Sequence, residues 1–151
     1  MYGFFYPTGT KLTLAPAANN PTTNEVNNRR PTTARITRIT LRTLAAAVAK
    51  AEGFTTPGSI AQQRNNPCNS RAKGDLGKSG GFGRFSTVEK GYQSCEKTLR
   101  FYISRGRTLQ QTINYFSPRA DHNNPVQHAD NIAIIADIDK NVPLKDLITN
   151  L

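Results

Sequence analysis

The sequence LAAAVAKAEGF, residues 44–54, indicates the fold class of the region that contains it. Its alanines favour a helix, because alanine has the highest helix propensity of all residues. Apolar residues also recur at helical spacing in and around this run, at positions 41, 44, 48 and 51. The pattern predicts an amphipathic helix that starts at about Thr37.

The end of this helix carries an isolated acidic residue. Gly53 is expected to stop the helix, because glycine readily adopts the left-handed conformation that ends many helices. Glu52 then lies in the last turn, next to the apolar stripe, and it is the only acidic residue between positions 26 and 74. Position alone favours a solvated carboxylate, so a catalytic role for Glu52 needs support from other motifs.

The segment after this helix has the composition of a loop region. Residues 55–86 contain six glycines and two prolines, with few regularly spaced apolar residues. Such a segment predicts loops and at most a short β-hairpin, with Gly80 and Gly81 at its turn.

A second long helix is expected to begin at Ser86. Ser86 and Glu89 have the spacing of a capping box, in which each side chain satisfies a free backbone N–H of the other residue. An apolar stripe at positions 88, 92, 95, 99 and 102 follows and ends near Gly106.

Three shorter helices are expected in the last third of the chain. Thr108 and Gln111 form a second capping-box pattern, which opens a helix through Tyr115. Asn124–Pro125 is typical of an N-cap followed by proline at the first helical position, and predicts a helix to about Asp137. Residues 141–150 are expected to form a closing helix. The fold class predicted for residues 35–151 is therefore mainly α (α+β), with a small loop or β-hairpin insertion after the helix that ends at Glu52.

The N-terminal segment, residues 1–34, differs from the rest of the chain. Sixteen of these residues are Asn, Thr or Pro. This composition buries too little apolar surface to offset the entropy of ordering the chain, so an arm or linker is expected. Residues 1–7 also lack the basic and apolar regions of a secretory signal.

The charge of the chain favours a polyanionic partner. Its net charge is +10, and residues 64–107 carry ten basic and three acidic residues. Nucleic acid, anionic lipid and bacterial cell wall all fit such a charge. No apolar run approaches the roughly 20 residues that span a bilayer, so no membrane span is expected. Two cysteines and two histidines do not form a zinc-finger pattern, and no metal or other cofactor is expected.

Four motifs occur in a recognisable order. They are AEGF at 51–54, PGSIAQQRNNPCN at 57–69, GFGRF at 81–85, and YFSP at 115–118 with DHNN at 121–124. Together they resemble the lysozyme-like superfamily, and within it the lytic transglycosylase or muramidase domains of phages and bacteria. The resemblance covers about residues 44–138 and implies a lysozyme-like fold for the domain at 35–151.

The resemblance implies that Glu52 is the catalytic acid, which protonates the glycosidic oxygen. Asparagine offers donors and acceptors to sugar hydroxyl and acetamide groups, and aromatic rings stack on the apolar faces of pyranoses. The resemblance also places a set of residues along a saccharide groove. For each of them, a purely structural role is the alternative to contact with the sugar. These substrate-binding candidates are Asn65, Asn66, Asn69, Phe85, Tyr115, His122 and His128, the last at a position where the pattern tends to have another aromatic residue.

A second carboxylate would distinguish a hydrolase from a lytic transglycosylase. Asp75 and Asp121 are the candidates. Asp75 is expected to form an exposed ion pair with Lys73 or Lys78, and Asp121 to cap a helix or contact solvent. Without a nucleophile, the substrate's own muramic 6-hydroxyl attacks, so a lytic transglycosylase is favoured over a hydrolase.

Two cysteines allow either one disulfide or two buried free thiols. Cys68 replaces a glycine of the family pattern, and Cys95 lies on the apolar stripe of the second long helix. From these two positions we expect their Cα atoms to lie within about 7 Å of each other, across the wall of the groove.

The function predicted from the sequence is cleavage of the bond between N-acetylmuramic acid and N-acetylglucosamine in bacterial peptidoglycan. A phage virion is the expected location, acting in the host cell wall or periplasm, with residues 1–34 tying the domain to other virion proteins. One alternative is an inactive glycan-binding or structural virion protein. The other is a basic nucleic-acid-binding module, which is disfavoured because the chain has no helix-turn-helix, zinc or RNP signature.

Overall fold

The structure is a computed structural model that describes residues 37–117 and 124–151. The predicted arm at 1–34 and the candidates His122 and Asp121 lie outside the described residues. The described part is mainly α, as predicted, and it contains two small two-stranded sheets, of which only the hairpin was predicted. No helix in this part is long and apolar enough to cross a membrane.

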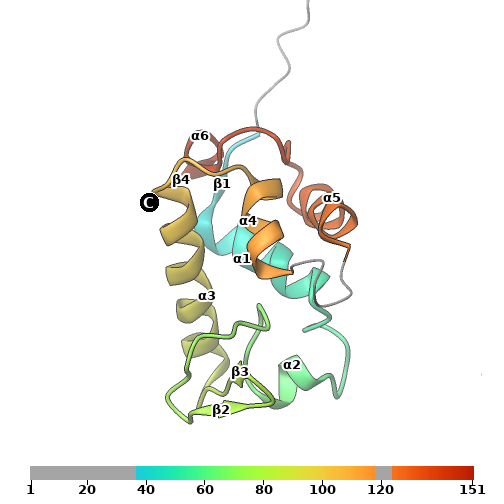
Figure 1. Cartoon of the computed structure of the whole chain (residues 1–151), viewed down its shortest axis with the longest axis vertical. Helices are drawn as coiled ribbons and strands as arrows, with labels where there is room; N and C mark the ends of the chain where they lie inside the picture. The colour runs from blue at the N-terminus through green and yellow to red at the C-terminus, as the bar shows by residue number, and fades with distance from the viewer. Residues whose placement is uncertain (1–36, 118–123) are drawn as a thin grey trace, which may run out of the picture. The chain divides into compact units, whose positions relative to one another are not determined.

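The described residues form helices and short strands (Figure 1). The helices are α1 Leu41–Ala51, α2 Ile60–Gln63, α3 Val88–Ile103, α4 Leu109–Phe116, α5 Pro125–Ala136 and α6 Leu144–Leu147. The strands are β1 Ile39–Thr40, β2 Lys78–Ser79, β3 Phe82–Gly83 and β4 Ile148–Thr149. β1 pairs with β4 in parallel, and β2 pairs with β3 antiparallel.

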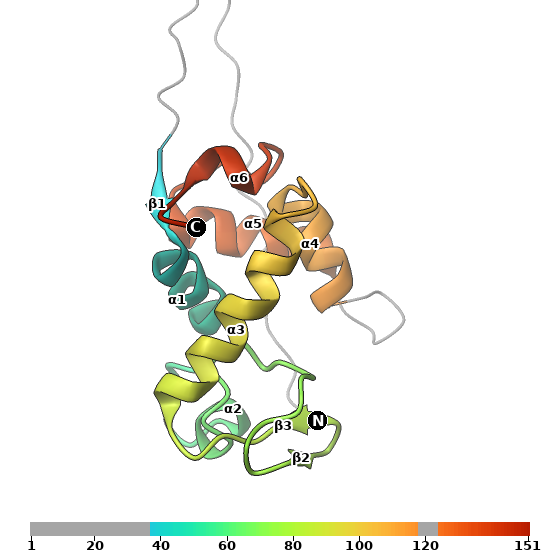
Figure 2. The ribbon, with the colours of Figure 1, turned by 90° about the vertical axis from the view of Figure 1, so that its left-hand side faces the viewer.

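The core lies between α1, α3, α4 and α5. Helix α1 packs against both α3 and α5, and α4 packs against α5. Figures 1 and 2 show α3 extending from the β2–β3 hairpin at one end to α6 at the other. The largest apolar side chains of this core that are fully buried are Leu44, Val48, Leu99, Leu109, Ile113, Ile132, Leu144 and Leu147.

Helix α1 ends as predicted and begins later than predicted. Gly53 follows its last turn with φ +76°, the left-handed conformation expected of a helix stop. At the other end, Thr40 is the N-cap, and its side chain accepts a hydrogen bond of 3.1 Å from the N–H of Thr43. Residues 39 and 40 are a strand instead of the first helical turn, because they pair with β4.

The predicted capping box of α3 is wrong by one residue. Thr87 is the N-cap and accepts a hydrogen bond from Lys90 N–H at 3.2 Å. Ser86 instead donates both its N–H and its hydroxyl to the carboxylate of Asp75. Glu89 is likewise engaged elsewhere, in an ion pair with Arg42. These tertiary partners compete successfully with the local pattern.

The starts of α4 and α5 are confirmed. Thr108 and Gln111 form the predicted capping box of α4, which ends at Phe116. Asn124 caps α5 by accepting a hydrogen bond from Gln127 N–H, with Pro125 at the first position. Here no tertiary partner in the described structure takes up the side chains of the two cap residues, so the local pattern holds.

The predicted closing helix at 141–150 is only one turn long. Helix α6 covers Leu144–Leu147, after which Ile148 and Thr149 become strand β4. Both are β-branched, and they pair with Ile39 and Thr40 at the far end of the domain's sequence. The hydroxyl of Thr149 also donates to the carbonyl of Ile39.

The segment 55–86 contains the predicted hairpin and a helical turn that was not predicted. β2 and β3 are joined through Gly80 and Gly81, which both have positive φ. The one-turn helix α2 begins after Ser59, whose side chain accepts a hydrogen bond from Gln62 N–H. A single capped turn has too few residues to show apolar periodicity, so the sequence does not reveal it.

Candidate active site

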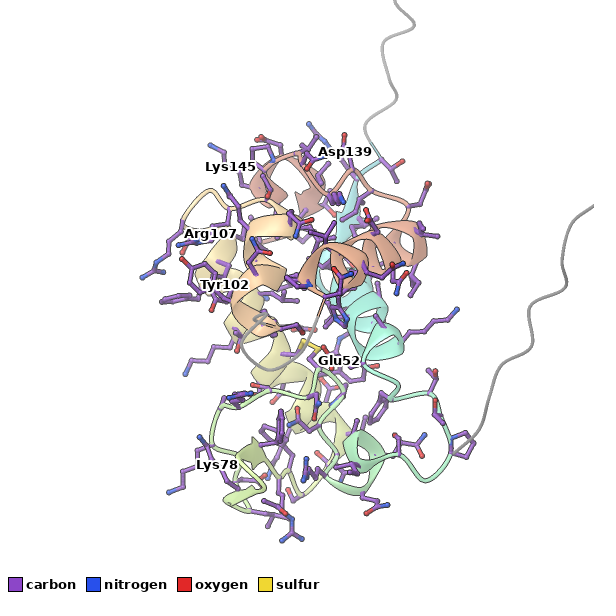
Figure 3. All side chains as sticks on the ribbon, turned by 45° about the vertical axis from the view of Figure 1, so that its right-hand side comes forward. Glu52, Lys78, Tyr102, Arg107, Asp139 and Lys145 are labelled. Carbon is purple, nitrogen blue, oxygen red and sulfur yellow. A yellow bond between two sulfur atoms is a disulfide. The ribbon has the colours of Figure 1, made fainter. Side chains whose placement is uncertain are left out.

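Glu52 occupies the C-cap of α1 and lines a pocket of about 220 Å³. Its backbone N–H donates to the carbonyl of Val48 at 2.9 Å, so its position is fixed by the helix. The side chain is 15% exposed. Figure 3 shows Glu52 beside the disulfide, between the helices and the hairpin region. The other residues that line this pocket are Cys68, Asn69, Arg71, Phe82, Phe116 and Ser117.

The turn at residues 65–70 forms one wall of the pocket, and Asn66 holds it together. Asn66 is fully buried. Its Nδ2 donates to the carbonyls of Ser70 and Gly83 at 2.9 and 3.0 Å, and its Oδ1 accepts from Ser70 N–H at 2.8 Å. These bonds tie the turn to strand β3. Asn66 is therefore a structural residue, and the prediction that it contacts the sugar is wrong.

Two other predicted groove residues serve the same wall. Asn65 has φ +49° and donates through Nδ2 to the carbonyl of Phe85 at 3.0 Å. The Phe85 side chain is 5% exposed, so it belongs to the interior and not to a saccharide surface. The predicted substrate contact through Phe85 is wrong for this reason. Asn65 contributes to the shape of the turn, and it does not line the Glu52 pocket.

The turn at residues 65–70, which forms this wall, contacts α3 at two points. Cys68 and Cys95 form a disulfide with a Cα–Cα distance of 5.8 Å, which confirms the predicted proximity. One turn earlier on α3, Gly91 lies so close to the turn that an added Cβ would be 2.0 Å from the carbonyl oxygen of Asn65. The left-handed residues of the turn are Asn65 and Asn69, so Cys68 does not need the conformation that a glycine would supply.

Among the described residues, His128 is an ionisable residue that lies against Glu52. Its Nε2 lies 3.1 Å from Oε1 of Glu52, and the His128 side chain is 20% exposed. The ring N–H is not aligned for a regular hydrogen bond, and Nε2 has no other partner in the described structure. The sequence placed His128 among the substrate-binding residues, but the structure places it against the candidate catalytic acid.

The remaining pocket residues offer polar and aromatic groups around Glu52. Oδ1 of Asn69 has no hydrogen-bond partner within the described part of the chain. The Phe82 ring packs against the guanidinium groups of Arg64 and Arg71, with distances of 5.2 and 5.5 Å to its centroid. Phe116 completes the aromatic lining from the end of α4.

A second pocket of about 190 Å³ adjoins the first. The two share Asn69, Arg71 and Phe116 as lining residues. Its far wall is formed by Tyr102 and Tyr115, whose rings stack with centroids 5.6 Å apart. Tyr115 is 56% exposed, so this predicted substrate-binding residue lies on the surface next to the site and not in the core.

Asp75, a candidate second carboxylate, does not line the Glu52 pocket. Lys90 and Ser86 hydrogen-bond its carboxylate at 2.7 and 2.6 Å, and these bonds hold the pKa of Asp75 well below its usual range. The predicted ion pair is present, but its partner is Lys90 and not Lys73 or Lys78. Glu52 is the only carboxylate lining this pocket among residues 37–117 and 124–151.

Sequence reasoning found the right motifs but often chose the wrong residue within them. Phe82 lies in the GFGRF motif, and Phe116 and Ser117 lie in the YFSP motif, yet none was singled out. Strand alternation does not distinguish Phe82 from Phe85, because β3 covers only residues 82 and 83. Arg71 was also missed, and no motif in the sequence marks it.

A larger pocket in the described structure lies away from Glu52. It measures about 690 Å³ and is lined by parts of α5 and the segment that follows, including Asp130, Asp137 and Asp139. Glu52 is not among its lining residues. Size alone would select this pocket, but the mostly buried carboxylate with polar and aromatic neighbours selects the smaller one.

The chain matches no family model, no curated protein and no solved structure. Its function must therefore be inferred from the chemistry of these side chains.

Proposed function

We propose that the protein is a peptidoglycan-cleaving lytic transglycosylase with a lysozyme-like domain, in which Glu52 is both the acid and the base. The observation that carries this proposal is the position of Glu52. A carboxyl group that is 15% exposed, fixed at a helix end and placed in a pocket is suited to proton transfer.

The other groups around Glu52 suit a saccharide. Asn69 presents an amide oxygen that has no partner among residues 37–117 and 124–151, and this oxygen can accept a hydrogen bond from an acetamide N–H or a hydroxyl. Phe82, Phe116 and Tyr115 supply aromatic surface along the two adjoining pockets. Such surface packs against the apolar faces of pyranose rings. The polar and aromatic lining therefore supports a glycan more than a small apolar ligand.

The reaction needs only one carboxyl group. Glu52 first donates its proton to the glycosidic oxygen, and the bond from that oxygen to C1 of the muramic residue breaks. The Glu52 carboxylate then accepts the proton of the muramic C6 hydroxyl, whose oxygen bonds to C1. The product is a 1,6-anhydromuramic end, and Glu52 regains its starting proton.

A hydrolytic muramidase is the nearest competing activity. Retaining and inverting glycosidases place two carboxyl groups about 5–5.5 Å or about 6.5–9.5 Å apart. Asp75 is engaged by Ser86 and Lys90 outside the pocket, which argues against it as the second group. Asp121 lies outside the described residues, and the Asp121→Asn variant in the next experiment tests whether it is the second carboxyl group.

Mass spectrometry of the products from purified peptidoglycan tests the proposal. A lytic transglycosylase releases anhydromuramic ends, whereas a hydrolase releases reducing ends that carry one more water. Anhydro products from the wild type are expected. Reducing ends that disappear in Asp75→Asn or Asp121→Asn would identify a hydrolase, and binding without any cleavage would identify a glycan-binding or structural protein.

The proposed setting is a phage virion that acts on the host cell wall or periplasm. Peptidoglycan is the proposed substrate, and the net charge of +10 suits a negatively charged wall. Residues 1–34 are proposed to attach the domain to other virion proteins. A salt-dependent gel shift with DNA tests the nucleic-acid alternative, which predicts tight binding that weakens steeply with salt.

A further inference from the structure

The wall of the second pocket that Tyr102 and Tyr115 form is accompanied by an arginine. The guanidinium carbon of Arg107 lies 4.3 Å from the centroid of the Tyr115 ring and 5.9 Å from that of the Tyr102 ring. Figure 3 shows Tyr102 and Arg107 next to each other. Both tyrosines line the pocket of about 190 Å³ that adjoins the Glu52 pocket. A ligand ring that packs on Tyr115 in this pocket therefore comes next to a positive charge.

The backbone fixes Arg107 in this place. Gly106, with φ +67°, turns the chain between α3 and α4 directly before it. The N–H of Arg107 donates to the carbonyl of Tyr102 at 3.3 Å, and its carbonyl accepts from the N–H of Leu144 at 3.0 Å. The guanidinium group is therefore held against the tyrosine rings in the free protein, which lowers the entropy cost of binding a ligand there.

The charge of Arg107 has no counter-ion in the described structure. No carboxylate of residues 37–117 and 124–151 pairs with it, and its buried Nε has no hydrogen-bond acceptor among them. Residues 97–117 carry four basic residues and no acidic one. The aromatic contacts offset part of the cost of removing a guanidinium group from water. An anionic group on a ligand would add the missing counter-charge and a charge-assisted hydrogen bond.

We propose that Arg107, together with Tyr102 and Tyr115, is a specificity-determining site that binds a muramic residue through a carboxylate of its substituent. This inference rests on the proposed function, because it takes peptidoglycan as the ligand. The pyranose ring packs on Tyr115, which is 56% exposed, while the carboxylate pairs with the guanidinium group. The two sugars of the strand alternate, and the muramic residue alone carries a lactyl group, with or without a peptide. A site that selects this residue fixes the register of the strand, and with it the bond that reaches Glu52.

Binding of glycan strands of different charge to the Glu52→Gln protein tests the site. The probes are peptide-free strands with free lactyl carboxylates and the same strands with these carboxylates converted to uncharged amides. The charged strands are expected to bind at least ~10-fold more tightly. A second substitution, Arg107→Gln, should remove this preference. Arg105→Gln is the matched control: it removes the same charge two residues away, where the guanidinium group packs on Phe101, and should keep the preference.

Equal binding of the two probes by the Glu52→Gln protein would overturn the proposal, and this comparison needs no change at Arg107. A preference that survives Arg107→Gln, or that both arginine variants lose alike, would also overturn it. Peptide-bearing strands separate the two sources of the carboxylate. Tight binding of these strands that depends on Arg107 identifies a carboxylate of the peptide, whereas a preference confined to peptide-free strands identifies the lactyl group.

The products of the wild type separate this proposal from the proposed function. A preference for charged strands that depends on Arg107, in a wild-type protein that cleaves nothing, would support the site and contradict the proposed function. Anhydromuramic products from a wild type whose Glu52→Gln variant binds both probes equally would support the proposed function and overturn the site.

Discussion

Replacing Gly91 by alanine should destabilise the protein, although alanine normally stabilises a helix. Gly91 lies inside α3, where alanine is favoured over glycine by about 1 kcal/mol. An added Cβ, however, would lie 2.0 Å from the carbonyl oxygen of Asn65 and 2.6 Å from Cδ of Pro67. A backbone atom cannot move aside as a flexible side chain can, so the cost should reach the upper part of the usual 1–3 kcal/mol range for overpacking.

The expected net effect is therefore a loss of ~2 kcal/mol in the free energy of unfolding. Urea denaturation followed by circular dichroism measures it as a lower midpoint with an unchanged slope. Gln93→Ala, at an exposed position of the same helix, is the matched control and should change stability by less than ~0.5 kcal/mol. A Gly91→Ala protein as stable as the wild type, or more stable, would refute the close packing of α3 against the wall of the site.

Three further predictions concern the disulfide, Asp75 and the N-terminal segment. Cys68→Ala/Cys95→Ala removes a cross-link over 27 residues and should lower the free energy of unfolding by ~3.5 kcal/mol, measured by urea denaturation; a loss below ~1 kcal/mol would contradict this. The lowered pKa of Asp75 adds stability that is present at neutral pH and is lost as the pH falls below the ordinary range of aspartate. Asp75→Asn should therefore be less stable than the wild type at neutral pH, with a difference that fades in acid, and a difference that does not depend on pH would contradict the pairing with Lys90. Removing residues 1–34 should leave the rate on soluble wall fragments unchanged, and a folded truncation that loses this rate would show that the segment belongs to the site.

The sequence predicts those elements whose signals are local and without competition. The caps at Thr108 and Asn124 are correct, because each needs only residues within its own first turn. The cap at Ser86 is wrong, because Asp75 binds that residue from another part of the chain. The strand at Ile148 and Thr149 is missed because its partner, Ile39–Thr40, lies more than a hundred residues earlier. Short sequence patterns give no information on the pairing of strands that lie so far apart in the chain.

The same limit applies to the candidate site. Glu52 could be selected because its helix, its stop signal and the motif order all indicate one residue. Asn66 and Phe85 were chosen from the right motifs, but their burial depends on how the turn and β3 pack together. The contact of His128 with Glu52 arises from the packing of α1 against α5, which no spacing in the sequence encodes.

The rate of anhydromuramic release from purified peptidoglycan by Glu52→Gln, compared with the wild type, tests the central claim most directly. Glutamine has nearly the same shape but cannot donate or accept the catalytic proton, and such transfer contributes about 10²–10⁴ in rate. With unchanged circular dichroism, the variant is expected to lose at least ~100-fold in rate. A folded Glu52→Gln protein that releases anhydromuramic products at the wild-type rate would contradict the assignment of Glu52 as the catalytic acid.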